Sequence, residues 1–337
     1  MSWLGLDIGG ANLKVADGEG FALAREFPLW QRPAELSEAI GDLLADAPAA
    51  KNLAITMTGE LADCFATKAD GVREILAALQ RAAAGRNVVV YLCDGRLVGP
   101  RVAQQQPWLT AASNWHVLAS YVCRFCSTET GLLLDIGSTT TDIISIGLSG
   151  PRAVGRTDPE RLVAGELVYT GVERSPLCAV TSHLPWRGEQ CPVAQEVFAT
   201  TLDAYLLLNQ LPEDACNTHT ADRRPRTRTN AHARLARAIC ADTTVFSLDD
   251  ARLAAETVRD AQLKQLTGAA EKVLQRLDNR AAVIVLSGHG EFLARQMLVP
   301  LSLAGRVVSL TEQLGSEISR CACAHALAVL ARERGAA

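Results

Sequence analysis

The feature that most constrains the fold is a repeated segment in which an apolar strand ends in Asp-Ile-Gly and continues through a polar turn into a second strand. The first copy reads LGLDIGGANLKVAD from Leu4 to Asp17, and the second reads LLLDIGSTTTDIISI from Leu132 to Ile146. Asp7 and Asp135 take matching places in the two copies (135 − 7 = 128 residues apart). The repeat predicts two α/β halves, each opening with a β-hairpin.

Length and composition fit a folded protein with two hydrophobic cores. The chain has 337 residues, of which 48% are hydrophobic and 21% charged, and this balance argues against disorder. A formal net charge of −4 gives no electrostatic reason to expect a nucleic acid or an anionic membrane as partner. No apolar run approaches the roughly 20 residues that span a bilayer. No signal peptide precedes the first strand, so we expect a cytoplasmic protein.

The ten cysteines are scattered and are expected to be reduced thiols. Cys123 and Cys126, and likewise Cys321 and Cys323, have the spacing of half a zinc site, but a structural zinc site needs four ligands. The two pairs are therefore interpreted as small apolar residues.

Strand and helix patterns alternate along both halves, which favours α/β domains with mixed sheets. In the first half we expect strands at 3–7, 12–16, 21–29, 52–57 and 87–92, and helices from residue 33 and over 71–84. In the second half two strands precede a connector rich in glycine and proline at 150–192. We then expect helices at 193–208, 248–277 and 316–332, and strands at 281–287 and 306–310.

The two glycine-containing turns have the chemistry of a phosphate cradle. Glycines allow backbone N–H groups to approach a phosphate closely, and hydroxyl and amide side chains add donors. An aspartate at the end of the strand cannot bind phosphate itself but can hold Mg²⁺, which bridges to it. The alternative is two ordinary hairpins with polar tips, but the repetition favours phosphate binding. The predicted donors are Gly9, Gly10, Ala11, Asn12 and Lys14, then Gly137, Ser138, Thr139 and Thr140, with Asp7, Asp135 and Asp142 on the metal side.

Together with VLSGHGEF, which contains Gly288 and Gly290, these turns resemble the two phosphate motifs and the adenosine motif of the ASKHA superfamily of acetate and sugar kinases, Hsp70 and actin. The resemblance implies two ribonuclease-H-like domains that face each other across a nucleotide cleft. We expect domain boundaries at 1–128 and 129–315, with a C-terminal helix in 316–337 that packs back on the first domain.

A narrower resemblance is carried by ITMTGELADCF (Ile55–Phe65), GELVYTGVERSPLCAV (Gly165–Val180) and HTADRRPRT (His219–Thr227). These segments resemble one branch of the hydantoinase/oxoprolinase-related proteins, associated with the tetrahydromethanopterin-linked one-carbon pathway. The branch implies an ether-forming reaction of methanofuran biosynthesis. In it an aminomethylfuran-methanol diphosphate alkylates the phenol oxygen of tyramine or γ-glutamyltyramine and releases diphosphate. The expected partners are therefore these small molecules. The sequence departs from the family pattern at Arg223, where that pattern has glycine.

Two carboxylates are candidates for the group that takes the phenol proton. Glu60 follows Thr58 and Gly59 at a strand end, although it could simply begin a helix. Glu166 follows Gly165 in a glycine-rich run, whose alternative interpretation is a connector with a core tyrosine. The predicted substrate-binding residues are Thr58, Gly59, Gly165, Tyr169, Thr170, Arg174, His219, Asp222 and Arg224.

The basic segment that contains Arg223, Arg224, Arg226 and Arg228 could be an anion clamp or a solvated loop. It has no interleaved aromatic residues for base stacking, so nucleic acid is not expected.

ATP is a ligand that both turns allow but that we do not favour, because the implied substrate carries its own diphosphate and His289 crowds the adenosine side. The rival functions are an ATP-dependent kinase, an ATP-driven hydrolase of the hydantoinase type, and a nucleotide-sensing module without catalysis. Homo-oligomer formation is left open by the sequence.

Overall fold

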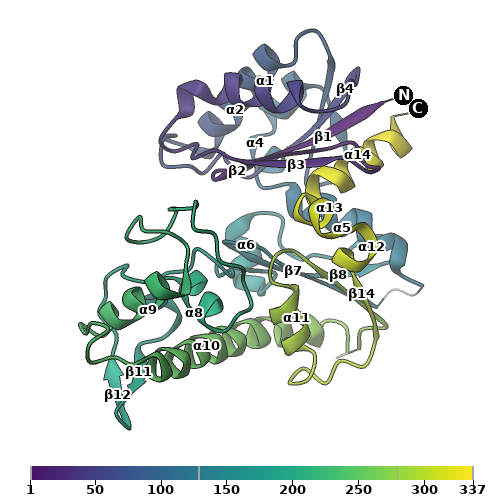
Figure 1. The fold of residues 1–337 in the computed structure, drawn as a ribbon. Helices are drawn as coiled ribbons and strands as arrows, with labels where there is room; N and C mark the ends of the chain where they lie inside the picture. The colour runs from purple at the N-terminus through teal and green to yellow at the C-terminus, as the bar shows by residue number, and fades with distance from the viewer. Residues whose placement is uncertain (1, 128–129, 279, 336–337) are drawn as a thin grey trace.

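The structure is a computed structural model and describes residues 2–127, 130–278 and 280–335. Two mixed sheets lie one above the other in Figure 1. The first has the strand order β3-β2-β1-β4-β5-β6, and the second β10-β8-β7-β13-β14, with β9 paired to β8. The first sheet contains β1 (Trp3–Ile8), β2 (Asn12–Ala16), β3 (Ala22–Glu26), β4 (Asn52–Met57), β5 (Asn87–Tyr91) and β6 (Leu97–Val98). The second contains β7 (Gly131–Ile136), β8 (Thr141–Gly147), β9 (Gly150–Pro151), β10 (Leu167–Val168), β13 (Val283–Ser287) and β14 (Arg306–Ser309).

Both sheets are built in the same way. The hairpin β1–β2 is antiparallel and β1 pairs with β4 in parallel, just as β7–β8 is antiparallel and β13 pairs with β7 in parallel. Every residue of β1 is buried, as expected for a central strand that is covered on both faces. The repeat in the sequence therefore corresponds to a repeated sheet topology, which confirms the predicted pair of ribonuclease-H-like sheets.

Helices cover the first sheet on both faces (Figure 1). The helices α1 (Leu36–Ala45) and α2 (Lys68–Ala82) share a hydrophobic core with β1 and β4. On the other face, α5 (Asn114–Val122) and α14 (Ala322–Arg334) share a core with residues of both sheets. The C-terminal helix α14 packs on β1. Short elements complete this half: η1 (Pro33–Glu35), α3 (Pro100–Gln105), α4 (Pro107–Thr110) and η2 (Cys123–Phe125).

A separate hydrophobic core lies in an insertion between β10 and the long helix α10 (Leu248–Gln275). The insertion and α10 form the lower left of Figure 1. The inserted elements are α7 (Leu177–Val180), β11 (His183–Trp186), β12 (Glu189–Pro192), α8 (Thr201–Leu207) and α9 (Arg228–Arg237). The remaining helices are α6 (Asp158–Ala164), α11 (Glu291–Met297), α12 (Leu310–Leu314) and α13 (Ser316–Arg320).

The structure differs from several expectations about single elements. The helix expected from residue 193 begins at Thr201, because Thr200 and Asp203 form a capping box that sets its start. The connector expected at 150–192 contains α6 and the hairpin β11–β12. The last helix is divided at Cys321 into α13 and α14. Among the described residues, no helix is both long and apolar enough to cross a membrane.

Candidate active site

The two glycine turns line one cavity of about 330 Å³, and residues of both sheets contribute to its wall. The turns have the same internal geometry. The N–H of Gly9 donates to the carbonyl of Asn12 over 2.9 Å, and the N–H of Gly137 donates to the carbonyl of Thr140 over the same distance. The repeated motif thus forms two equivalent turns that face a common space.

Each turn is supported by a neighbouring segment of backbone. The N–H of Leu29 donates to the carbonyl of Gly10, and the N–H groups of Glu173 and Arg174 donate to the carbonyl of Ser138. Gly171 lies so close to the second turn that an added Cβ would be 2.5 Å from the carbonyl oxygen of Gly137. These contacts fix the turns before any ligand binds, which is the preorganisation that an anion site needs.

Asp7 and Asp135 lie at equivalent places beside the turns and both line the cavity. Burial raises the pKa of Asp7, an effect that Lys14 opposes. Burial and the neighbouring Asp142 raise the pKa of Asp135 to about 7. One oxygen of Asp7, Oδ1, is buried without a hydrogen-bond partner in the described part of the chain. A bound cation would account for the raised pKa values and for the unpaired oxygen, because it would compensate the buried negative charge and contact that oxygen.

Asp142, the third predicted metal-side carboxylate, lines the cavity but has a protein cation as its partner. The guanidinium of Arg161, which is 2% exposed, donates to Asp142 Oδ1 over 2.5 Å. Arg161 also lies 4.2 Å from the centroid of the Trp115 ring. Within the described residues, no group of three His, Cys, Asp or Glu side chains is arranged to hold a metal. A cation site at Asp7 and Asp135, which both line the cavity, therefore stays a prediction.

Glu60 reaches the cavity from the loop after β4 and is 1% exposed. Its carboxylate oxygen Oε2 has no hydrogen-bond partner among the described residues. Burial raises the pKa of Glu60 to about 7, although the nearby Lys68 ammonium opposes the rise. A carboxylate with such a pKa can accept a proton near neutral pH.

The cavity brings together most of the predicted site residues. It is lined by Asp7, Gly9, Gly10, Asn12, Lys14, Thr58, Glu60, Asp135, Gly137, Ser138, Thr139, Thr140, Asp142, Tyr169, Arg174 and Gly288. The cavity lining does not include the predicted residues Gly59, Gly165, Glu166, Thr170, His219, Asp222, Arg224 and Gly290.

Glu166, a candidate for the proton acceptor, lies outside the cavity lining and is bonded within the fold. It is fully buried, and its carboxylate accepts hydrogen bonds from the N–H groups of Val154 and Gly155 and from the guanidinium of Arg276. Thr170 is also buried, in a network with Ser175. Gly165 adopts a positive φ of 74° as the C-cap of α6, which accounts for a glycine there.

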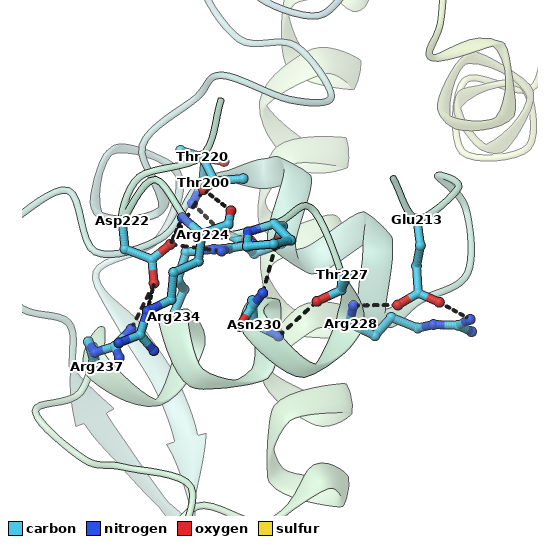
Figure 2. A network of polar contacts seen from close by, with 12 residues as sticks. Thr200, Glu213, Thr220, Asp222, Arg224, Thr227, Arg228, Asn230, Arg234 and Arg237 are labelled. Carbon is cyan, nitrogen blue, oxygen red and sulfur yellow. Dashed lines mark hydrogen bonds and ion pairs between the residues drawn. The ribbon is translucent and has the colours of Figure 1, made fainter. Parts of the chain in front are cut away.

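The basic segment forms an internal network in the insertion, which Figure 2 shows around Asp222 and Arg234. Arg234 is fully buried and donates to Asp203 over 2.7 Å and to Asp222 over 2.9 Å. Arg226 pairs with Glu173 at 3.0 Å. Arg224, with 59% of its side chain exposed, lies 3.9 Å from Asp222. Carboxylates of the protein already neutralise much of this basic charge, so the anion clamp stays a prediction for Arg224 and Arg223.

His219 contacts the first half of the chain instead of the cavity, through an Nδ1 to Oε1 distance of 3.0 Å to Glu26. His289 does line the cavity, and burial lowers its pKa to about 4. Gly290 packs against β7, where an added Cβ would be 2.4 Å from Ile136 Cγ2.

Sequence reasoning missed several polar residues of the cavity wall. Asp158 and Arg161 were missed because residues 150–192 were interpreted as a connector. The capping-box pattern of Thr157 and Glu160, which marks the start of α6, is the signal that could have found them. The other missed residues are Asn114, Ser287, Ser319 and Arg320.

Two sheets with the same strand order, which face a shared cavity through equivalent turns, define the ASKHA class of proteins. The family model for Hydantoinase/oxoprolinase matches residues 52–333. The chain belongs to the hydantoinase/oxoprolinase family.

Curated relatives lie in methanogenic archaea. The chain is 30% identical to the (4-{4-[2-(gamma-L-glutamylamino)ethyl]phenoxymethyl}furan-2-yl)methanamine synthase of Methanocaldococcus jannaschii over 336 residues, which cover 98% of each protein. It is 31% identical to the synthase of the same name from Methanococcus vannielii over 205 residues, 59% of this chain and 89% of that one. Among solved structures, the ethanolamine utilization protein EutJ from Carboxydothermus hydrogenoformans aligns with a TM-score of 0.48 and 12% identity, over 98% of this chain and 90% of that chain.

Proposed function

We propose that this protein is a transferase of methanofuran biosynthesis that joins an aminomethylfuran-methanol diphosphate to a phenolic amine and releases diphosphate. The observation that carries the proposal is the 30% identity to the M. jannaschii synthase across 98% of both chains. The name of that relative describes an aryl ether between a phenol and a furan-methyl group, so a furan-methyl donor and a phenolic acceptor are the matching substrates.

In this reaction the bond from the furan methylene carbon to the diphosphate oxygen breaks, and a bond from that carbon to the phenol oxygen forms. The donors of the two turns would bind the diphosphate. Asp7 and Asp135 are the residues that would hold Mg²⁺, and a bound Mg²⁺ supplies positive charge that stabilises the leaving diphosphate. Phosphate oxygens and water would complete the coordination, as is usual for this ion.

The phenol proton must leave as the ether forms, because a phenol with a pKa near ~10 is a weak nucleophile until it is deprotonated. We assign this step to Glu60, whose pKa of about 7 suits a general base near neutral pH. The proton passes from the phenol oxygen to the carboxylate and then to solvent.

The test is incubation of the purified protein with Mg²⁺, the furan diphosphate, and either tyramine or γ-glutamyltyramine. We expect the aryl ether by mass spectrometry and one diphosphate per ether, without ATP. Glu60→Gln should lower the rate, with exposed Glu256→Gln as the matched control. Absence of the ether with both acceptors would contradict the proposal.

A second candidate is an ATP-driven hydrolase or small-molecule kinase. The match of the Hydantoinase/oxoprolinase family model to residues 52–333 favours it, because the same turns can hold a nucleotide. Consumption of ATP that depends on a small-molecule substrate would support this candidate.

A further inference from the structure

A chain of charged side chains lies next to Glu60 at the edge of the cavity and joins the two halves of the protein. The Lys68 ammonium lies 3.8 Å from Glu60 Oε1 and 2.6 Å from Asp158 Oδ2. Lys68 is the first residue of α2 in the first half, and Asp158 is the first residue of α6 in the second half. Asp158 continues the chain to Arg161 at 3.7 Å, and Arg161 contacts Asp142. Lys68 is therefore held between a carboxylate of each half.

The position of Lys68 is unfavourable for α2 on its own. A cation in the first turn of a helix opposes the helix dipole, which favours negative charge there. Its side chain is 12% exposed, so it also loses most of its hydration. Residues that break a local rule are expected where function requires them. The ion pairs to Glu60 and Asp158 are what compensate this position.

The first turn of α2 also lies unusually close to Glu60. An added Cβ at Gly71 would be 2.2 Å from the carbonyl oxygen of Glu60 and 2.7 Å from its Cα. Glycine inside a helix costs about 1 kcal/mol relative to alanine. The chain keeps a glycine there, which allows α2 to bring Lys68 against Glu60.

The groups that face Glu60 come from four parts of the fold. Lys68 and the backbone N–H of Ala112 favour the charged carboxylate, whereas burial and the charge of Asp158 disfavour it. Cys93 also faces Glu60, but burial raises the pKa of its thiol to about 12, so this group stays neutral. Lys68 is the cation in this set, and Asp158 is its competing anion.

We propose that Lys68, held beside Glu60 by its ion pair with Asp158, is a positioning residue that sets the ionisation of Glu60 and thereby the pH range in which Glu60 accepts the substrate proton. The inference rests on the proposed function for the identity of that proton. It makes opposite predictions for the loss of Lys68 and for the loss of the Asp158 charge. Loss of Lys68 removes the stabilising cation from Glu60, whereas loss of the Asp158 charge removes a repelling anion and frees Lys68 for Glu60.

The experiment compares Lys68→Met, Asp158→Asn and the wild type by the pH dependence of kcat/KM. An opposite charge at this distance lowers a carboxyl pKa by about one unit or more. We therefore expect the acidic limb to move to higher pH by about one unit in Lys68→Met and to lower pH in Asp158→Asn. Lys68→Arg should restore most of the wild-type profile, since it keeps the charge. Arg73→Met on the exposed side of the same helix should leave the profile unchanged.

A structural effect alone would lower the rate at all pH values without moving the limb. An unmoved limb in Lys68→Met, or shifts of the two variants in the same direction, would overturn the inference. A second readout needs no substrate: the carboxyl carbon of Glu60 can be titrated by NMR in protein labelled with ¹³C-glutamate and assigned with Glu60→Gln. If no ether forms in the wild type, the proposed function fails, and this titration still decides whether Lys68 sets the ionisation of Glu60.

Discussion

Lys14 and Asp142 occupy equivalent positions in the two hairpins, opposite Asp7 and Asp135 respectively, but they carry opposite charges. In the first hairpin Lys14 lies opposite the aspartate of the motif, so that a cation lies within the strand pair. In the second hairpin two carboxylates face each other, and their charge is met by Arg161 from α6. The negative charge at Asp135 therefore has less compensation from its own hairpin, which agrees with its raised pKa of about 7.

The first prediction concerns Asp7 and Asp135. Asp7→Asn and Asp135→Asn should each lower kcat by about 100-fold or more, the scale of losing charge stabilisation at a reacting centre. Both folds should stay intact, because burial already disfavours the charged form at these positions. Steady-state kinetics with circular dichroism checks this, and Asp249→Asn on the exposed start of α10 is the control. A folded variant with a near-normal rate would contradict the proposal that Asp7 and Asp135 stabilise charge at the reacting centre.

Sequence could identify Asp7, Asp135 and both turns because their chemistry is written in adjacent residues. It could not identify Lys68 or Asp158, because the role of each depends on a residue in a distant element. The Lys68 ammonium lies 2.6 Å from Asp158 Oδ2, although 90 residues separate the two in the sequence. Glu166 shows the reverse case. Its local sequence pattern suggested a catalytic carboxylate, but that carboxylate accepts hydrogen bonds from backbone N–H groups and from Arg276.

At the scale of elements, the strands and the long helices followed from periodicity, and α10 ends at Gln275 where the pattern predicted residue 277. The insertion was less predictable. Its helices are short, and α8 is fixed by its cap and by burial of all its residues and not by an amphipathic repeat. The strand expected at 21–29 ends at Glu26, because Phe27 and Leu29 bond to the first turn instead of a neighbouring strand.

The network in Figure 2 provides a prediction for the insertion. Arg234→Met should lower the free energy of unfolding by about 3–5 kcal/mol, since it leaves the carboxylate of Asp203, 1% exposed, without its cation. Arg228→Met at the start of α9 is the matched control. Its side chain is 50% exposed and pairs with Glu213, so the loss should stay below about 1 kcal/mol. Urea unfolding measures both, and equal losses of stability in the two variants would contradict a larger contribution of the buried Arg234.

At the scale of the whole molecule, α14 connects the halves because it packs on β1 and shares a core with residues of both sheets. Gly5 permits this contact: an added Cβ would be 2.1 Å from the carbonyl oxygen of Ala324. Gly5→Ala should therefore cost about 1–3 kcal/mol of stability. Gly41→Ala in α1 is the control. Its Cβ would meet no described atom within 4 Å, so a gain of about 0.5–1 kcal/mol is expected. Denaturant unfolding that ranks the two variants in the opposite order would contradict the packing argument.

The last prediction asks which ligand the cavity between the halves binds. Ligand binding to the folded state raises stability by RT ln(1 + [L]/Kd), which is about 2.7 kcal/mol at a hundredfold excess over Kd. We expect diphosphate with Mg²⁺ to raise the unfolding temperature, because both turns and both aspartates contact one cavity. ATP should protect less, since His289 and the closely packed Gly288 line the cavity at the motif that would contact adenosine. Thermal unfolding of the wild type and of Asp135→Asn measures this, and the variant should lose the Mg²⁺-dependent part. Stronger protection by ATP than by diphosphate, together with ATP consumption during turnover, would favour the hydrolase or kinase over the transferase.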